Sequence, residues 1–280
     1  MFIQKTRVSA SLLFTMALIC CGSFAFAESL WDLQAVDANG VGTHPKALGE
    51  PIESNKVTVE GIALNAPAEL LNPSTAWQIY VQAEGDDTGG IAVWAGKWYQ
   101  QANWPKYSTD IQAGDRVHVR GYLMPNARGK VNINERHSAD PAMQLEVTVL
   151  ERGVGMPDLQ VIPSLAHCNF FDMHRAGGGE RYQAQWVELR GVTLQSGNWV
   201  AGQTVVITDA SGATLDMLLS SEGEFTDPAP TQTFTVRGIF DQEDLTSPFW
   251  ENYRLWVKSD ADVIADVPSS SVATGWELYE

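Results

Sequence analysis

Aromatic, cationic and amide side chains alternate with apolar residues along four predicted strands in the N-terminal half of this 280-residue chain. Every second side chain of a strand lies on the same face. With the apolar residues facing inward, the outer face carries Tyr80, Trp94, Arg116, His118, Arg120 and Asn132. Single-stranded nucleic acid needs this combination, because bases stack on aromatic rings and arginines contact phosphates. The same residue types suit sugars, whose apolar faces pack on aromatic rings while amides bind the hydroxyls.

A smaller set of the same residue types lies in the C-terminal half. Arg254 and Trp256 alternate with apolar residues along one predicted strand, and Arg237 lies on the strand before it. A solvated strand face explains this set nearly as well as a ligand site does. For the first set, the competing interpretation is that Tyr80 and Trp94 pair across two strands and pack beneath residues 97–104.

Other groups of reactive side chains match no standard site. The four potential zinc ligands between His167 and His174 lack zinc-finger spacing, and two phenylalanines among them indicate packing. The acidic run 84–87 lies where a hairpin turn is predicted and lacks EF-hand spacing. No catalytic motif and no identifiable acid–base pair is found. The sequence therefore predicts a protein that is not an enzyme and that uses no metal or cofactor.

The strands that would position the outer face belong to a pattern that occurs twice. Residues 114–122 and 233–240 both alternate and both reach Val-Arg-Gly followed by an apolar pair. Alternation indicates a half-buried strand. A glycine embedded in such a strand indicates a bulge or sharp bend of the kind that curls a sheet into a barrel.

Each Val-Arg-Gly strand follows a similar series of shorter strands. The first series comprises residues 57–64, 77–82 and 90–94, followed by 130–135 and 145–150 after the repeated strand. The second comprises residues 185–194, 204–208 and 213–219, followed by 253–258. Five strands without helical periodicity predict a small barrel in each half, with residues 145–150 packing at the end of the first.

Each half resembles the OB-fold module of bacterial secreted proteins, the type that accompanies extracellular nucleases and occurs in exported proteins of unknown function. The resemblance lies in residues 59–62, 79–82 with 91–93, and 114–121 of the first half, and in residues 189–192, 209–212 and 236–238 of the second. It implies an all-β fold of two five-stranded OB-like Greek-key barrels in tandem. It also implies a ligand on the outer face of the second and third strands.

The predicted organisation has six parts. These are a signal peptide (1–27), an N-terminal arm (28–54), OB-like barrel 1 (55–152), a connector (153–182), OB-like barrel 2 (183–266) and a mobile tail (267–280).

The first residues predict export. Lys5 and Arg7 precede an apolar run that ends in Ala25-Phe26-Ala27, which is typical of a secretory signal peptide cleaved before Glu28. The alternatives are a retained membrane anchor, for which the run is short, and a lipoprotein, for which no small residue precedes either candidate cysteine. We expect a periplasmic or extracellular protein.

Charge and cysteine content limit the partners. Cleavage would lower Lys plus Arg from 18 to 16 against 34 Asp plus Glu, so the net charge would change from −16 to −18. Such a charge disfavours adsorption to polyanions. Cys168 would be the remaining cysteine, which excludes an intramolecular disulfide.

The sequence thus predicts an exported binding protein, with single-stranded nucleic acid on the outer face of barrel 1 as the leading hypothesis. A carbohydrate or a protein partner is the alternative, which the acidic charge permits more easily. A purely structural role is a third possibility. No membrane span is predicted after cleavage.

Overall fold

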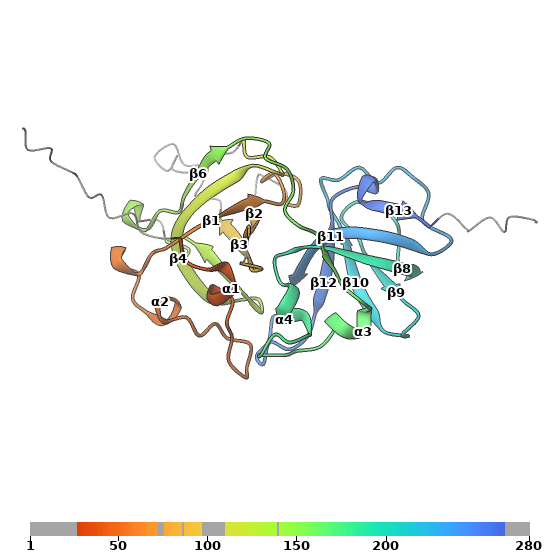
Figure 1. Cartoon of the computed structure of the whole chain (residues 1–280), viewed down its shortest axis with the longest axis horizontal. Coiled ribbons are helices and arrows are strands. Elements are labelled where there is room, and N and C mark those ends of the chain that lie inside the picture. The colour runs from red at the N-terminus through yellow and green to blue at the C-terminus, as the bar shows by residue number, and fades with distance from the viewer. Residues whose placement is uncertain (1–26, 72–75, 86, 97–109, 139, 267–280) are drawn as a thin grey trace, which may run out of the picture.

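The computed structural model describes residues 27–71, 76–85, 87–96, 110–138 and 140–266. These residues form a mostly β structure of two sheets that lie side by side (Figure 1). The helices are single turns: α1 (Leu30–Leu33), α2 (Pro45–Leu48), α3 (Leu165–Cys168) and α4 (Gly179–Tyr182), with 3-10 turns at Glu53–Asn55, Pro141–Met143 and Asp260–Asp262. The prediction of a β protein is confirmed. The predicted tail, residues 97–104 and nearly all of the predicted signal peptide lie outside the described residues.

The first sheet has six strands: β1 (Val57–Ala63), β2 (Trp77–Gln82), β3 (Gly90–Ala95), β4 (Arg116–Ala127), β5 (Lys130–Asn134) and β6 (Glu146–Glu151). Its order is β1-β2-β3-β5-β4-β6, and β1 also pairs with β4. Five strands therefore form a ring, with β6 outside it. The pairing of β3 with β5 is parallel, and the others are antiparallel.

The second sheet contains a closed five-stranded barrel. Its strands are β7 (Gln160–Val161), β8 (Trp186–Ser196), β9 (Thr204–Thr208), β10 (Thr214–Leu219), β11 (Phe234–Gln242), β12 (Tyr253–Val257) and β13 (Val263–Ala265). Strands β8, β9, β10, β12 and β11 follow one another around the barrel, and β11 closes it against β8. This order matches that of β1, β2, β3, β5 and β4, and the parallel pair lies at the equivalent place.

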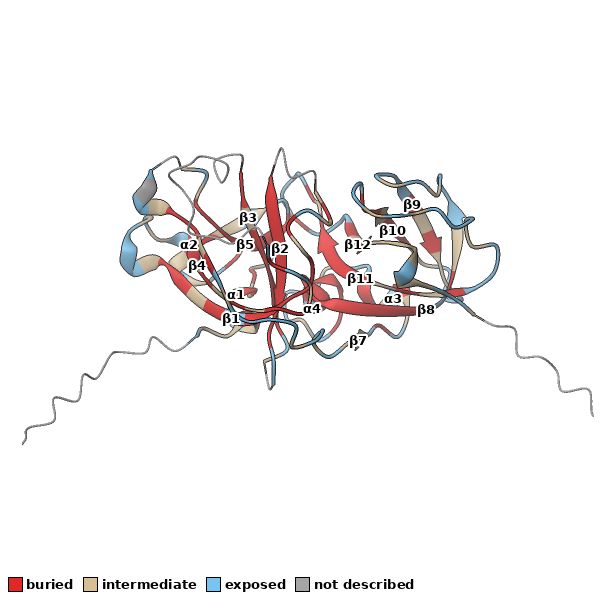
Figure 2. Cartoon of the chain, turned by 90° about the horizontal axis from the view of Figure 1, so that it is seen from above, coloured by how far each residue is buried: buried red, intermediate tan, exposed pale blue. Residues whose placement is uncertain are grey.

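Each sheet encloses an apolar core of its own, and strands are the most buried elements of both halves (Figure 2). The predicted inward-facing residues of the first half are all in its core: Ile79, Val81, Ile91, Val93, Val117, Val119, Val131 and Ile133. A third cluster, which includes Tyr80, Trp186 and Trp256, joins the outer faces of the two sheets. The sheets are thus packed on each other through the outer faces of both, opposite the faces that line the two cores.

The glycine of each Val-Arg-Gly lies where its strand changes partners. Gly121 is the last residue of β4 that pairs with β1, and Tyr122 begins the pairing with β5. Gly238 pairs with β8, and the pairing with β12 starts one residue later. No register shift occurs at either glycine, so a bulge is wrong at these positions, and what the pairing shows there is a change of partner strand. Gly191 is the true bulge: its φ is +63°, and the register of β8 with β11 shifts beside it.

Gly121→Ala is expected to lower the free energy of unfolding by about 2 kcal/mol, because the added methyl group overpacks the core. A Cβ at this position would lie 2.7 Å from Ile133 Cγ2 and 2.8 Å from Leu145 Cδ1. Urea unfolding measures the change. Gly212→Ala is a useful comparison, because no atom lies within 4 Å of its Cβ position and only the φ of +78° is strained. Equal stability of Gly121→Ala and wild type would contradict the closure role of this glycine.

The N-terminal arm contacts both halves of the chain. The amide of Trp31 donates to Asp87 Oδ1 of the first half at 3.1 Å. The guanidinium of Arg175, in the second half, lies 4.0 Å from the centroid of the Trp31 ring. Further along the arm, the carbonyl of Ala38 accepts a hydrogen bond of 2.9 Å from the indole of Trp250. The arm therefore links the two sheets as well as preceding them.

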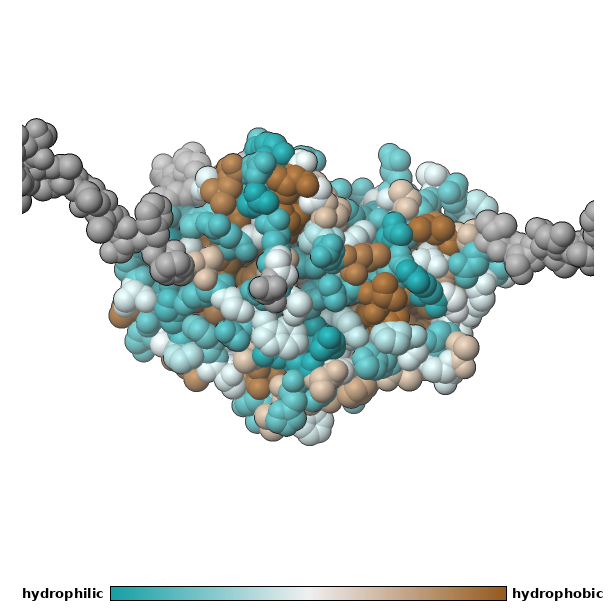
Figure 3. Space-filling view, in the orientation of Figure 1, coloured by the Kyte–Doolittle hydropathy of each residue, from teal (hydrophilic) through white to brown (hydrophobic). Residues whose placement is uncertain are grey.

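Apolar side chains on the surface are dispersed. On the face shown in Figure 3, hydrophobic residues form small groups separated by hydrophilic ones. Exposed large apolar residues come from different elements and loops, such as Leu48, Leu150, Val200 and Leu245. Among the described residues, no helix has the length and apolar character needed to cross a membrane.

Candidate functional site

The structure separates the nine predicted site residues into two places. Four of them line one cavity between the sheets: Trp94, Asn132, Arg254 and Trp256. Tyr80 is buried in the same interface. The other four lie on outer strand faces and do not line this cavity: Arg116, His118, Arg120 and Arg237.

The cationic row along β4 is neutralised by carboxylates on neighbouring segments. Arg116 contacts Glu84 at 2.8 Å and Glu151 at 2.5 Å. His118 Nδ1 lies 3.2 Å from Glu60 Oε1, directly across from it on β1. Arg120 pairs with Glu146 at 3.2 Å and also with Glu53. The hydrogen bonds from the two arginines lower the pKa values of Glu84 and Glu53. Both arginines of the row are therefore ion-paired and His118 faces a carboxylate, so the row is not an open positive surface.

Arg237 has the same arrangement on the second sheet. Its Nε donates to Glu188 Oε2 at 2.8 Å, and Arg190 donates to the other oxygen of the same carboxylate at 2.6 Å. Glu188 lies opposite Arg237 in the pairing of β8 with β11. Arg237 is thus engaged within the sheet.

Tyr80 does not lie on an open surface, in contrast to the sequence-based expectation. Its ring is fully buried and meets the edge of Trp256 with centroids 6.3 Å apart. In the register of β2 with β3 it lies opposite Ala92, while Trp94 lies opposite Gln78. Tyr80 and Trp94 are therefore diagonal neighbours on the two strands and not directly opposite each other, and the residues proposed to cover them, 97–104, lie outside the described residues. The second sheet covers this ring, which a single-barrel argument does not anticipate.

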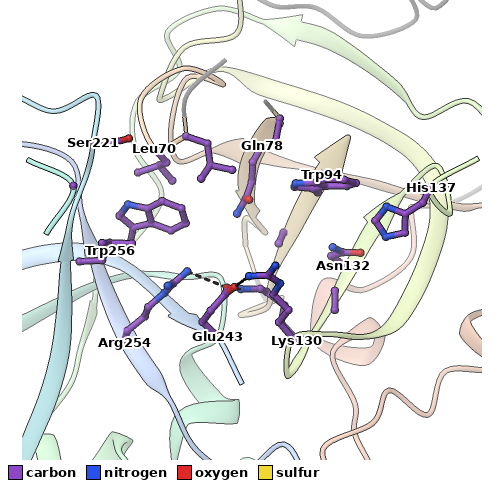
Figure 4. Close-up of a pocket in the computed structure, with 17 residues that line it drawn as sticks. Leu70, Gln78, Trp94, Lys130, Asn132, His137, Ser221, Glu243, Arg254 and Trp256 are labelled. Atoms are coloured by element: carbon purple, nitrogen blue, oxygen red, sulfur yellow. Dashed lines mark hydrogen bonds and ion pairs between the residues drawn. The ribbon is translucent and has the colours of Figure 1, made fainter. Parts of the chain in front are cut away.

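The cavity between the sheets has a volume of about 680 Å³, and we call it the inter-sheet cavity. Figure 4 shows Trp256 and Arg254 of the second sheet on one side and Trp94, His137 and Asn132 of the first on the other. Apolar residues line other parts of it: Leu70, Leu71, Ala76, Ala92 and Leu218. Its volume is in the range of about 300–1,000 Å³ that is typical of small-molecule sites.

Ionic side chains form one end of the inter-sheet cavity. Asp241 lies opposite Arg254 in the pairing of β11 with β12, and its Oδ2 accepts from Arg254 Nη2 at 2.7 Å. Lys130, from the first sheet, donates to Asp241 Oδ1 at 2.7 Å. Glu243 contacts Lys130 at 3.4 Å, Arg254 at 3.1 Å and also Arg128. These five residues, the ion-pair cluster, connect the turn between β4 and β5 to the second sheet.

Burial and charge act in opposite directions on Asp241. Burial alone would raise its pKa, but Lys130 and Arg254 more than offset this and lower the pKa to about 2. Asp241 is therefore ionised throughout the neutral range. The ion-pair cluster therefore keeps both its positive and its negative charges inside the interface.

Three uncharged polar side chains reach the wall of the inter-sheet cavity. Gln78 is 7% exposed, points inward in Figure 4, and its amide has no hydrogen bond within the described part of the chain. Asn132 accepts a hydrogen bond from Asn134 at 2.9 Å through its oxygen. His137 meets the Trp94 ring with centroids 4.8 Å apart, and burial lowers its pKa. Its imidazole is therefore uncharged at neutral pH.

Sequence reasoning missed the acidic members of this site. Asp241 and Glu243 were not selected, although Asp241 follows the alternation of β11 and lies beside the selected Arg254. Asp241 has apolar neighbours in sequence and lies on the outer face of β11, and this pattern indicates a carboxylate that faces the same side as Arg254. Lys130 also lies on the outer side of its predicted strand, but its partner Asp241 is 111 residues away, and no local pattern links the two.

Comparisons with known proteins do not assign this chain to a family. No family model and no curated protein matches the chain. Among solved structures, one described as "murine DNA binding protein bound with ds DNA" is similar, with 12% identity and a TM-score of 0.32. That match covers 75% of this chain and 96% of the other. Similarity at this level carries no inference about a ligand, so function is argued from the residues of this chain.

Proposed function

We propose that this protein is an exported, non-enzymatic binding protein of two OB-like Greek-key barrels, and that it holds its ligand in the inter-sheet cavity. The order of the five ring strands is the same in both sheets, which supports a repeated barrel. OB barrels bind ligands on the outer face of their second and third strands. In the first half these strands are β2 and β3, and both contribute to the inter-sheet cavity.

The observation that carries the proposal is the combination of aromatic and unpartnered polar side chains in one hollow. Two indoles, Trp94 and Trp256, share the cavity with the amide of Gln78, which is nearly buried and without a hydrogen bond in the described residues. The Gln78 amide faces the cavity, so a ligand there can form hydrogen bonds with it that no described residue makes.

Two ligand chemistries have a ring with an apolar face and a polar edge. One is a nucleobase, which would bring single-stranded nucleic acid to the mouth of the cavity rather than to the row along β4. This possibility would use the half-buried ring of Trp94 and the exposed side chain of Arg128, which line the same cavity. The other is a carbohydrate, which needs no phosphate contact.

Trp94→Ala is expected to weaken ligand binding about tenfold or more, since loss of one stacking contact costs about 1–3 kcal/mol. Tryptophan fluorescence and calorimetric titration measure the affinity. The panel contains neutral oligosaccharides, nucleosides, mononucleotides and oligothymidylate. Trp250→Ala is the matched control, because Trp250 is exposed and does not line the cavity.

Two outcomes would contradict the proposal. One is the absence of binding by every member of the panel at millimolar concentration. The other is a ligand whose affinity is the same for wild type and Trp94→Ala. Circular dichroism of each variant establishes that the fold is retained.

A further inference from the structure

We infer that the ligand of the inter-sheet cavity is a neutral carbohydrate rather than a phosphate-bearing nucleotide. This inference rests on the proposed function, because it names the ligand class for the same cavity. It follows from three properties of the cavity wall: where the aromatic rings are, which polar groups are free, and which cations are already paired.

The aromatic rings come from both sheets. Trp94 lies on β3 and Trp256 on β12, and Figure 4 shows them on opposite sides of the cavity, with Leu70 near Trp256. A sugar ring has two faces, and each presents C–H groups that pack against an indole. Trp256 is 3% exposed and the Arg254 guanidinium lies 5.0 Å from its ring centroid, so the half-buried ring of Trp94 is the one with more surface for a sugar to cover. Aromatic side chains of this kind provide apolar area together with a polar edge.

The free polar groups are uncharged. Gln78 offers an amide, Asn132 has its amide nitrogen without a hydrogen bond in the described residues, and His137 is neutral because burial lowers its pKa. Amides and neutral imidazoles both donate and accept hydrogen bonds. Sugar hydroxyls also donate and accept, so a hydroxyl can form a hydrogen bond with either the donor or the acceptor atom of each of these groups. A phosphate only accepts, and it would leave the acceptor atoms of the wall unmatched.

The cations of the cavity are largely occupied by protein acceptors. An ammonium has three N–H donors. The Lys130 ammonium meets three acceptors: the carboxylates of Asp241 and Glu243 and the carbonyl of Gln242. Arg254 uses Nε and Nη2 on Asp241, and Nη2 also on Glu243. A phosphate entering the cavity would find Lys130 and the Nε and Nη2 atoms of Arg254 already bonded to protein acceptors, with Arg254 Nη1 left to donate. Both carboxylates would repel it.

Arg128 is the exception, and it lies at the edge of the site. Its side chain is 64% exposed and already contacts Glu243. A single exposed guanidinium contributes little net attraction in water, because water and salt screen the charge. The electrostatics of the cavity thus favour a ligand without charge.

The test compares neutral oligosaccharides with nucleotides on the full mature chain at low and high salt. We expect at least one of cellobiose, maltotriose, diacetylchitobiose or the members of a neutral glycan array to bind with an affinity that salt leaves unchanged. Contacts with phosphates would instead weaken steeply as salt rises. Gln78→Ala is expected to weaken binding about tenfold or more. Gln195→Ala, an exposed glutamine outside the cavity, is the matched control.

The outcomes separate this inference from the proposed function. Binding of a nucleotide or oligonucleotide that depends on Trp94 and Gln78, with no saccharide bound, would overturn the carbohydrate inference and leave the cavity as the site. Saccharide binding that is unchanged in Trp94→Ala and Gln78→Ala would overturn both. Saccharide binding that is lost in both variants and retained in Gln195→Ala and Trp250→Ala would support both.

Discussion

Asp241→Asn is expected to lower the free energy of unfolding by about 3–5 kcal/mol, the cost of breaking a buried ion pair by removing one charge. The Asp241 side chain is 1% exposed and lies between Lys130 at 2.7 Å and Arg254 at 2.7 Å. Asparagine has nearly the same size, so packing is retained. The change leaves the two cations inside the interface with only Glu243 to compensate both. Urea unfolding at neutral pH measures the difference.

The pH dependence provides an independent measure of the same interaction. The pKa of Asp241 falls from 3.8 to about 2 in the folded protein. A carboxyl with a lowered folded-state pKa contributes stability that is present above the unfolded value of 3.8 and is lost as pH falls through about 2. The difference between wild type and Asp241→Asn should therefore be full at neutral pH and shrink in that acidic window.

An exposed ion pair is the appropriate control for Asp241→Asn. Glu151 is 59% exposed and pairs with Arg116 on β4. Glu151→Gln should change stability by about 0–1 kcal/mol, because water already screens this pair. If Asp241→Asn costs no more than Glu151→Gln, the ion-pair cluster does not stabilise the contact between the sheets.

Alternation of residue types was sufficient to predict the interior of the first sheet. Ile79, Val81 and Val117 were placed inward from the period of two alone, and all are fully buried. The repeated glycines were also informative, because a strand that leaves one partner for another has no room for a side chain at the crossing point. Both signals are local, so the sequence contains them in short segments.

The candidate site depends on contacts that local patterns do not contain. Alternation placed Tyr80 and Arg120 together on an outer face, but only the pairing partners determine what covers each residue. Tyr80 is covered by the second sheet, while Arg120 meets Glu146, which lies opposite it on β6. Register and the contact between sheets depend on segments distant in sequence. Patterns within short segments of a sequence provide no information about them.

The second large effect concerns a carboxyl group buried beside the second barrel. Glu180 in α4 is 3% exposed. Its Oε1 accepts hydrogen bonds from Tyr253 Oη at 2.8 Å and from Gln183 Nε2 at 3.1 Å. Burial raises the pKa of Glu180 from 4.5 to about 7, against the opposing effects of these hydrogen bonds and of Arg175. The folded protein therefore favours the protonated form.

Glu180→Gln is expected to raise the free energy of unfolding by about 3 kcal/mol at about pH 8, because the variant no longer buries a charge. Glutamine keeps an oxygen that accepts from both Tyr253 and Gln183. A raised folded-state pKa contributes stability that is fully present below 4.5 and is lost as pH rises through about 7. The gain from Glu180→Gln should accordingly be near zero below pH 4.5 and grow across this window.

Unfolding experiments at a series of pH values test this expectation through the difference between variant and wild type, which removes the contributions of other titrating groups. Glu251→Gln is the control, because Glu251 is exposed and its replacement should leave the curve parallel to that of wild type. A Glu180→Gln variant that is less stable than wild type at about pH 8, or whose difference does not change with pH, would show that Glu180 is held as a carboxylate. In that case the hydrogen bonds from Tyr253 and Gln183, and not burial, would dominate at this position.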